Sequence, residues 1–391
     1  MSLVNYSGRY DAIVVGVGAM GSATAYYLAR RGKRVLGLER FSIPHTMGSY
    51  HGYTRIIRLA YLEHPSYVWL LRRAYELWRE IQREVNEQLL YITSSIDAGP
   101  EDSWVFKGSL ESCKLHDLPH EVLTSSELKQ RHPGYNLPHE HFALLQPEGG
   151  FLAPERCVVS YVMAAQARGA EIHAHEKVLE WEPLEGGVRV RTDRGTYYEA
   201  DKLVVTAGAW DADLLDVLQG LAVPERQVLA WLQPTRPKHF RPDTFPVFNL
   251  QVDEGRFYGF PVFGVPGFKF GKYFHLGETN HADEIDRQPH DYDEQLLRQF
   301  AERYFPDGCG PTMSLVACTF TNTPDHHFII DLHPEYPQVC IASPCSGHGF
   351  KFASVVGEIM ADLAEEGMTR HDISLFRLER FGHLRAGGAT G

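Results

Sequence analysis

The chain has 391 residues, with 38 lysine and arginine residues against 50 aspartate and glutamate residues and a formal net charge of -12. Apolar residues make up 43% and charged residues 23%, which is typical of a globular protein and excludes a disordered chain or a coiled coil. An acidic chain without a lysine/arginine block binds nucleic acid poorly and is not attracted to an anionic membrane. Its uncharged apolar runs are too short for a membrane span.

The N-terminus and the cysteines indicate the compartment. Residues 1–8 lack a basic start followed by an apolar core, so the sequence predicts no signal peptide. Six cysteines are too few for a disulfide scaffold, and none has the CxxC spacing of a zinc ribbon. We therefore expect a cytoplasmic protein with no metal site, no nucleic-acid partner and no membrane partner.

The first forty residues have the pattern of a strand, a glycine turn, a helix and a second strand. Tyr10–Val15 is a short apolar strand, residues 16–21 are the glycine turn, and residues 23–31 are a helix. The second strand, residues 33–38, ends at Glu39. Such a crossover connection makes a parallel sheet.

The rest of the chain alternates between parallel-sheet and antiparallel patterns. Helical periodicity is found in residues 66–87, 154–168, 293–304 and 351–366. Strands are expected in residues 171–182, 188–199, 203–206, 328–331 and 338–342. Residues 226–274 alternate aromatics and prolines, which predicts an antiparallel sheet. One nucleotide-binding domain is therefore assembled from separated pieces, with a sheet-rich domain between them.

The glycine turn has the spacing of a dinucleotide site. Gly16 allows the tight turn, Gly18 lets a pyrophosphate approach the backbone, and Gly21 lets the helix pack on the sheet. Glu39 lies 23 positions after Gly16, where it can accept hydrogen bonds from ribose hydroxyls and repel a 2′-phosphate. Because no second βαβ half follows directly, FAD is favoured over NAD. An NAD-dependent dehydrogenase and a non-catalytic protein of this fold stay as alternatives.

Three further segments resemble one family. They are residues 48–58, residues 317–325 and residues 346–352. With the glycine turn they resemble the monomeric sarcosine oxidase family, which includes N-methyltryptophan oxidase and belongs to the amino-acid-oxidising flavoproteins. The resemblance runs over essentially the whole chain, in order.

The resemblance implies a two-domain flavoprotein of the glutathione-reductase/D-amino-acid-oxidase type, combining α/β and antiparallel β structure. Its Rossmann-like FAD-binding domain takes residues 1–89, 150–220 and 318–391. Its substrate domain takes residues 90–149 and 221–317.

The resemblance also implies one covalent FAD per chain, attached through the thioether of Cys318. The loop of Gly347 and Gly349 opens the last helix, and its N–H groups stabilise negative charge on the flavin. We also place Thr54 and Gly208 among the cofactor-binding residues.

Cations in the matching segments are assigned to the substrate and the flavin. The family binds the substrate carboxylate through residues that match Arg58 and Lys351, because a carboxylate needs a cationic clamp. Arg55 resembles the arginine beside the flavin ring, where positive charge favours the reduced flavin. Lys269 matches the lysine that promotes the reaction with oxygen, because a fixed cation stabilises superoxide. His348 resembles an active-site histidine.

Two tyrosines complete the expected site. Tyr258 matches a tyrosine over the substrate pocket. Tyr273 stands where sarcosine oxidases carry a histidine four residues after the lysine, so sarcosine itself is in doubt. Tyr50 and Tyr53 likewise replace a histidine and an acid.

The resulting hypothesis is an FAD-dependent oxidase of secondary N-methyl amino acids. Oxidative demethylation of its amino-acid substrate by oxygen would give a primary amino acid, formaldehyde and hydrogen peroxide. N-Methyltryptophan, pipecolate, proline and fructosyl amino acids remain alternative substrates. The expected partners are this small molecule and oxygen, and the expected state is a monomer.

Overall fold

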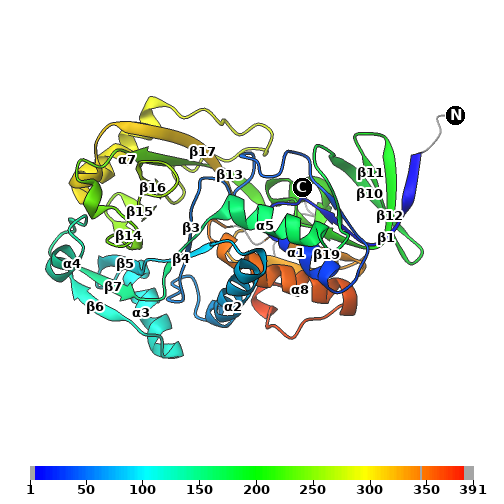
Figure 1. The fold of residues 1–391 in the computed structure, drawn as a ribbon, viewed down its shortest axis with the longest axis horizontal. Coiled ribbons are helices and arrows are strands. Elements are labelled where there is room, and N and C mark those ends of the chain that lie inside the picture. The colour runs from blue at the N-terminus through cyan, green and yellow to red at the C-terminus, as the bar shows by residue number, and fades with distance from the viewer. Residues whose placement is uncertain (1–4, 344–345, 383–391) are drawn as a thin grey trace. The chain divides into compact units, whose positions relative to one another are not determined.

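The computed structural model describes residues 5–343 and 346–382, which form two compact units (Figure 1). Unit 1 comprises residues 1–50, 155–224 and 320–391, and unit 2 comprises residues 51–154 and 225–319. This division differs from the predicted one chiefly in residues 51–89, which lie in unit 2. The physical reason is strand pairing: β3 (Arg55–Ile57) and β4 (Leu90–Ile92) both pair with β8 (Gly150–Leu152) of the same unit.

Unit 1 contains the α/β part of the chain. Its strands are β1 (Asn5–Val15), β2 (Val35–Leu38), β9 (Glu171–His173), β10 (Val178–Leu184), β11 (Gly187–Thr192), β12 (Thr196–Val205), β18 (Ile329–Leu332) and β19 (Val339–Ser343). Its helices are α1 (Ala19–Arg30), α5 (Pro154–Gln166), α6 (Asp211–Leu214) and α8 (Ala353–Glu366). Short 3₁₀ helices include Gly208–Trp210 and Phe350–Phe352.

The sheet of unit 1 is parallel at its centre. Strands β12, β1, β2 and β9 lie in that order, and β19 pairs with the other side of β12. The strands β10 and β11 extend it as an antiparallel meander. Residues 203–205, expected as a separate strand, are the end of the long strand β12, which pairs antiparallel with β11 and parallel with β1.

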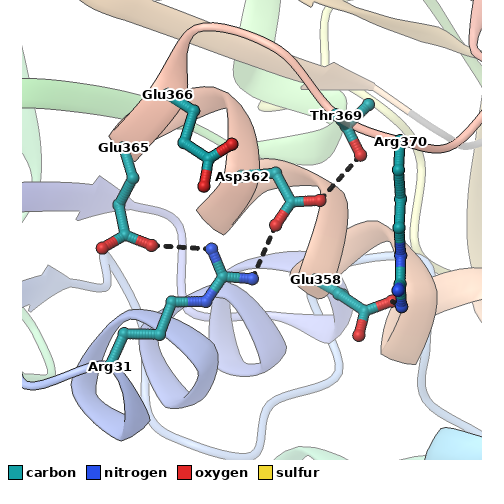
Figure 2. Close-up of a pocket in the computed structure, with 7 residues that line it drawn as sticks. All are labelled: Arg31, Glu358, Asp362, Glu365, Glu366, Thr369 and Arg370. Atoms are coloured by element: carbon teal, nitrogen blue, oxygen red, sulfur yellow. Dashed lines mark hydrogen bonds and ion pairs between the residues drawn. The ribbon is translucent and has the colours of Figure 1, made fainter.

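Two helices of unit 1 approach each other closely. A Cβ atom on Gly357 of α8 would lie 2.5 Å from the Cβ of Ala23 in α1, so only glycine permits this approach. Arg31, just after α1, also forms ion pairs of 2.6 Å with Asp362 and 2.7 Å with Glu365 of α8 (Figure 2). Because these ion pairs are partly exposed, close packing contributes more to holding the helices together.

Unit 2 is dominated by a second sheet. The strands of unit 2 are β3, β4, β5 (Ser95–Pro100), β6 (Glu121–Thr124), β7 (His141–Gln146), β8, β13 (Val223–Leu232), β14 (Val247–Val252), β15 (Gly255–Phe260), β16 (Phe268–Lys272) and β17 (Thr312–Asn322). Its helices are α2 (Tyr67–Val85), α3 (Trp104–His116), α4 (Ser125–Arg131) and α7 (Asp291–Tyr304). Within the described residues the large sheet has the strand order β17-β13-β16-β15-β14-β5-β7-β6.

Alternation along these strands separates an apolar face from a polar face. On the apolar face, Phe248, Phe257 and Phe270 pack with residues of α7 in one buried core. The ring of Phe257 stacks on Phe300 of α7 with centroids 3.7 Å apart. The other face therefore has to be covered by something else, and its polar residues form the site described below.

Among the helices of the described residues, none combines the length and the apolar character needed to cross a bilayer.

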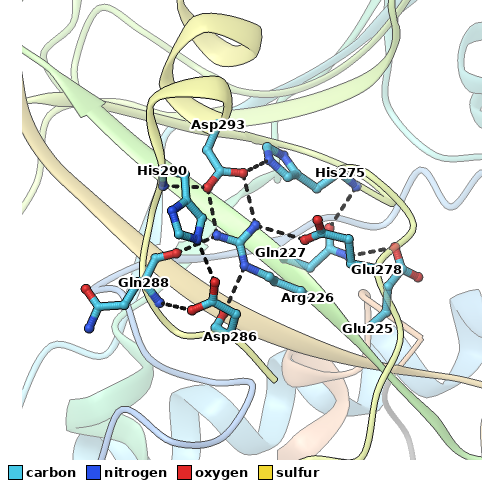
Figure 3. Close-up of polar contacts among 9 residues, drawn as sticks. All are labelled: Glu225, Arg226, Gln227, His275, Glu278, Asp286, Gln288, His290 and Asp293. Atoms are coloured by element: carbon cyan, nitrogen blue, oxygen red, sulfur yellow. Dashed lines mark hydrogen bonds and ion pairs between the residues drawn. The ribbon is translucent and has the colours of Figure 1, made fainter. Parts of the chain in front are cut away.

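A buried ionic network holds the segment that follows β16 in unit 2 (Figure 3). Arg226 of β13 donates to both carboxylate oxygens of Asp293 at the start of α7, at 3.0 and 2.7 Å. The second hydrogen-bond partner of Asp293 is His275 Nε2, at 2.7 Å. Arg226 also donates to the backbone oxygens of Asp286 and Gln288. The network thus fixes the chain between β16 and α7.

Burial lowers the pKa of His275 below its ordinary value, although Asp293 opposes this shift. Arg226 already pairs with Asp293, so a protonated His275 would be a second buried cation beside one carboxylate. The unfolded state therefore binds a proton on this histidine at higher pH than the folded state does. The stability that neutral His275 contributes is present above about pH 6.5 and declines below it, by up to about 1.4 kcal/mol per pH unit.

We predict that the stability difference between the wild type and the variant His275→Gln narrows as pH falls from 7.5 to 5, because glutamine does not titrate. Urea unfolding at each pH measures both free energies. A difference that stays constant over this pH range would contradict the prediction.

Candidate active site

The glycine turn of unit 1 has the geometry of a phosphate cradle. Gly16 has a φ of +85°, and a Cβ there would lie 2.6 Å from the backbone oxygen of Thr206. A Cβ on Gly21 would lie 1.8 Å from the oxygen of Gly16. At Gly18, by contrast, a Cβ would meet only the ring of Tyr50 at 3.6 Å, so the backbone is open to a ligand on that side.

The N-terminus of α1 adds to this cradle. Its N-cap residue is Gly18, no side chain caps the helix, and its first turn holds no acidic residue. Backbone N–H groups at such a terminus favour an anion. The spacing and the open backbone therefore fit the pyrophosphate of a dinucleotide.

Glu39 lies just after β2 and is buried, with 4% of its surface exposed. Its carboxylate oxygens accept hydrogen bonds from the backbone N–H groups of Val17 and Phe41, each at 2.9 Å. Burial raises the pKa of Glu39, while these two hydrogen bonds lower it. A carboxylate held in this way has oxygen lone pairs left to accept hydrogen bonds from a ribose, so the residues fit the adenosine half of FAD.

The other predicted residues of unit 1 lie in two loops. Gly208 has a φ of +62° and begins a 3₁₀ helix directly after β12. Gly347 has a φ of +75°, and a Cβ there would lie 2.6 Å from the ring of Phe320. Gly349 precedes the 3₁₀ helix Phe350–Phe352, which leads into α8. The two positive φ values explain why glycine occupies these turns.

His348 lies between the last two of these glycines, and Lys351 lies in the 3₁₀ helix that follows them; both are buried. The Nζ of Lys351 donates to the backbone oxygen of His348 at 2.7 Å. The ring of His348 lies against Phe328, and its Nε2 lies 2.9 Å from the oxygen of His326. The structure therefore brings these two predicted residues together.

In unit 2, the predicted residues occupy the polar face of the large sheet. The cross-strand pairs of Tyr258 with Asn249, and of Tyr258 with Gly271, place these three residues in one row. Asp97 of β5 extends the row through its pairing with Asn249. Lys269 lies in the next row along β16, two residues from Gly271 and on the same face.

Lys269 connects this face to the segment that precedes β3. It has 2% of its surface exposed. Its Nζ donates to the backbone oxygen of Gly52 at 2.7 Å, and to the backbone oxygen and Oγ1 of Thr54 at 2.8 and 2.9 Å. The ammonium also lies 4.3 Å from the ring centroid of Phe260. Burial with full hydrogen bonding keeps a positive charge at a fixed place in a region of low dielectric.

Arg55 and Cys318 are neighbours within the same unit. Arg55 Nη1 donates to the oxygen of Thr54 at 2.8 Å, and Nη2 donates to the oxygen of His51 at 2.5 Å. The same Nη2 lies 3.7 Å from Sγ of Cys318 on β17. The structure therefore brings these two predicted residues into contact.

Arg58 is fully buried and already has internal partners. Its Nη2 lies 3.1 Å from Oε2 of Glu63, and its Nε lies 3.5 Å from Oδ2 of Asp97. Burial by itself would lower the pKa of Arg58, but the two carboxylates raise it above its ordinary value. Arg58, which is predicted to bind the substrate carboxylate, is therefore a cation whose charge is balanced by Glu63 and Asp97.

Tyr258 and Tyr273 meet edge to face, with ring centroids 4.9 Å apart. Burial raises the pKa of both phenols, so both are neutral at physiological pH. A Cβ on Gly271 would lie 2.8 Å from the hydroxyl of Tyr258, so the glycine makes room for this phenol. The guanidinium of Arg256 lies 3.8 Å from the ring centroid of Tyr273.

Comparison with known proteins identifies the family. Residues 11–363 match the family model described as FAD dependent oxidoreductase. The chain is 42% identical over 375 residues to a monomeric sarcosine oxidase of Streptomyces avermitilis, covering 95% of this chain and 97% of that protein. It is 36% identical to an N-methyl-L-tryptophan oxidase of Yersinia pestis, covering 95% and 99%.

The chain belongs to the FAD-dependent oxidoreductase family, with the monomeric sarcosine oxidases and N-methyltryptophan oxidases as relatives.

Solved structures agree with this assignment. NikD, described as an unusual amino acid oxidase essential for nikkomycin biosynthesis, has a TM-score of 0.83 at 27% identity and covers 95% of this chain and 98% of its own. L-Proline dehydrogenase from P. horikoshii has the same TM-score at 22% identity, which shows the shared fold. The predicted fold class and the choice of FAD over NAD are thereby confirmed at the level of the family.

Sequence reasoning missed four members of the unit 2 site: Glu63, Asp97, Asn249 and Arg256. Asp97 and Asn249 have 0% of their surfaces exposed. A charged or amide side chain within an otherwise apolar strand was the available signal, because such groups are buried only with partners. Their partners lie on distant strands.

Proposed function

We propose that this protein is an FAD-dependent oxidase of secondary N-methyl amino acids. The family supports the cofactor and the class of reaction. The observation that carries the proposal is a cluster in unit 2: residues 51–54 accept hydrogen bonds from the Lys269 ammonium and the Arg55 guanidinium, and this guanidinium lies 3.7 Å from the sulfur of Cys318.

Bound FAD supplies the two-electron chemistry that oxidises a carbon–nitrogen bond and transfers the electrons to oxygen. Gly16, Gly18, Gly21 and Glu39 are proposed to hold its adenosine diphosphate half. Thr54, Gly208, Gly347 and Gly349 are proposed to lie along its remaining length. The proposed covalent bond joins it to Cys318, whose sulfur lies 3.7 Å from the Arg55 guanidinium.

The chain's own residues are proposed to bind the substrate carboxylate through Arg58 and Lys351. Glu63 occupies one side of the Arg58 guanidinium, so a substrate carboxylate would compete with Glu63 for these N–H groups. Tyr258 and Tyr273 supply apolar ring surface that excludes water from the substrate. Arg55 and His348 are proposed to stabilise negative charge that develops during the reaction.

The proposed overall reaction consumes an N-methyl amino acid, oxygen and water, and it produces a primary amino acid, formaldehyde and hydrogen peroxide. The proposed state is a monomer, as the names of the sarcosine oxidase relatives suggest.

A peroxide assay across a substrate panel tests this function. The purified holoenzyme is given sarcosine, other N-methyl amino acids, pipecolate, proline and a fructosyl amino acid. We expect hydrogen peroxide, and equimolar formaldehyde, from at least one N-methyl amino acid. Peroxide from pipecolate, proline or the fructosyl compound alone would reject demethylation.

Covalent attachment is tested at Cys318. Acid-precipitated wild-type protein should keep its yellow colour, and Cys318→Ser should release the flavin into the supernatant. Cys309→Ser is the matched control, because this cysteine lies in unit 2 next to Arg298. Its precipitate should stay yellow. Free FAD in the wild-type supernatant would remove the covalent bond from the proposal.

Lys269 is assigned to the reaction with oxygen, and Lys269→Met deletes the charge while it keeps the aliphatic stem. We expect anaerobic reduction by substrate to slow only modestly. Reoxidation by oxygen should slow by about 10²–10³-fold, because one preorganised electrostatic group is lost. Stopped-flow mixing of reduced enzyme with oxygen measures that step.

Lys272→Met is the control for this experiment, since Lys272 lies on the same strand but alternates to the other face. It should leave both half-reactions unchanged. If Lys269→Met is reoxidised as fast as wild type, Lys269 serves only to hold residues 52–54.

A further inference from the structure

At one end of the polar face of unit 2, cationic and anionic side chains alternate. The proposed reaction assigns a role to only some of them. Arg256 Nη2 lies 2.9 Å from Oε1 of Glu63, and Arg58 Nη2 lies 3.1 Å from the other oxygen of Glu63. Arg58 Nε then lies 3.5 Å from Oδ2 of Asp97. Oδ1 of Asp97 accepts a hydrogen bond of 2.9 Å from Asn249 Nδ2.

Three polar atoms of this cluster are buried without a hydrogen-bond partner among the described residues. They are Nε of Arg58, Nε of Arg256 and Oδ1 of Asn249. A buried donor or acceptor without a hydrogen bond lowers the free energy of unfolding by about 1–3 kcal/mol. Three such atoms in neighbouring residues therefore destabilise the folded protein substantially. Such a cost is tolerated where a ligand supplies the missing partners.

The unsatisfied atoms define the chemistry of that ligand. Two of them are N–H donors and one is a carbonyl acceptor, so the matching group both accepts and donates hydrogen bonds. With Arg58 proposed to bind the substrate carboxylate, only the Arg256 guanidinium is left beside the carboxylates of Glu63 and Asp97, so the cluster offers no net attraction to a second anion. An uncharged carboxamide or hydroxyl offers both an acceptor for the Nε of Arg256 and a donor for the Oδ1 of Asn249, whereas an alkyl group offers neither.

The position of this cluster on the sheet is suited to binding the side chain of a substrate. Lys269, proposed to lie at the reacting end, and Tyr273, at the Arg256 end, are four residues and therefore two rows apart. At about 3.3 Å per residue this is roughly 13 Å between backbone positions. The row of Tyr258 and Gly271 lies between, and Gly271 contributes no side chain there. The guanidinium carbon of Arg256 lies 3.8 Å from the ring centroid of Tyr273.

We propose that Arg256 and Asn249, supported by Asp97 and Glu63, form a subsite for an uncharged carboxamide or hydroxyl on the side chain of the secondary amino acid. This inference rests on the proposed function and narrows its substrate class. Arg256 and Asn249 are then the residues that determine specificity.

Three side chains of nearly equal size test the subsite. The holoenzyme is assayed for peroxide with N-methyl-L-asparagine, N-methyl-L-aspartate and N-methyl-L-leucine, and then with the glutamine, glutamate and methionine analogues to vary the length. We expect kcat/KM for the better amide to exceed that of its alkyl partner by at least about 10²-fold. A site built to hydrogen-bond its substrate strongly rejects an analogue that lacks the group. The amide should also exceed the acid.

Two variants test which residues cause the preference for an amide side chain. Asn249→Leu removes the acceptor at constant volume, and Arg256→Met removes the guanidinium and keeps an unbranched chain. Each should lower the amide-to-alkyl ratio of kcat/KM by about 10-fold or more. Arg303→Met, at an exposed arginine of the same unit, is the control and should keep the wild-type ratio. If Arg256→Met does not fold, Asn249→Leu alone decides.

A binding measurement complements turnover. The product amino acids L-asparagine and L-leucine are compared by the rise in Tm that each gives to the holoenzyme, and asparagine should give the larger rise only when Asn249 and Arg256 are present.

The outcomes separate the two proposals. No peroxide from any N-methyl amino acid rejects the proposed function. Peroxide with the alkyl substrate equal to or better than the amide rejects the subsite and leaves the function standing. A preference for N-methylaspartate or N-methylglutamate rejects the uncharged ligand. An amide preference that survives both variants places the subsite elsewhere.

Discussion

The site of unit 2 depends on one buried charge. The ammonium of Lys269 has almost no contact with solvent, so each of its hydrogens requires an acceptor. Gly52 and Thr54 supply three oxygens, which ties the segment before β3 to strand β16 although more than 200 residues separate them. Because that segment is fixed, the Arg55 guanidinium is held against the sulfur of Cys318 and Arg58 enters the sheet face beside Asp97.

The alternation of the large sheet explains how so many charges are accommodated. One face is filled by phenylalanines and by α7, and this apolar packing stabilises the unit. The other face can then carry Asp97, Asn249, Arg256 and Lys269, because Asp97 and Asn249 pair across neighbouring strands while Arg256 and Lys269 find partners in Glu63 and residues 52–54. The Arg226–Asp293 network fixes the chain that leaves β16. Stability and chemistry are therefore assigned to opposite faces of the same strands.

The family relationship and the local departures from it concern different parts of the molecule. The glycine cradle, Glu39, Lys269 and Cys318 all fit flavin binding and flavin chemistry, in agreement with membership in the FAD-dependent oxidoreductase family. The replacement at Tyr273 brings an arginine onto its ring, and Glu63 joins that arginine to Arg58. In the proposed site, the reaction with oxygen and the substrate preference can thus change independently, because Lys269 and Arg256 lie on different rows of the sheet.

Much of the fold was readable from the sequence because it is encoded locally. The glycine turn with its strand and helix, and the amphipathic helix expected over residues 66–87 and found at Tyr67–Val85, follow from spacing within one element. The helices α3 and α4 were missed although each has a local signal, the N-cap Ser103 and the capping box of Thr124 and Glu127. The place of residues 51–89 in unit 2 was missed because tertiary pairing decides it. The pairing of Asp97 with Asn249 joins positions 152 residues apart. Only the register of the folded sheet brings Arg58, Arg256 and their carboxylates together, because local periodicity carries no information about which distant strands become neighbours.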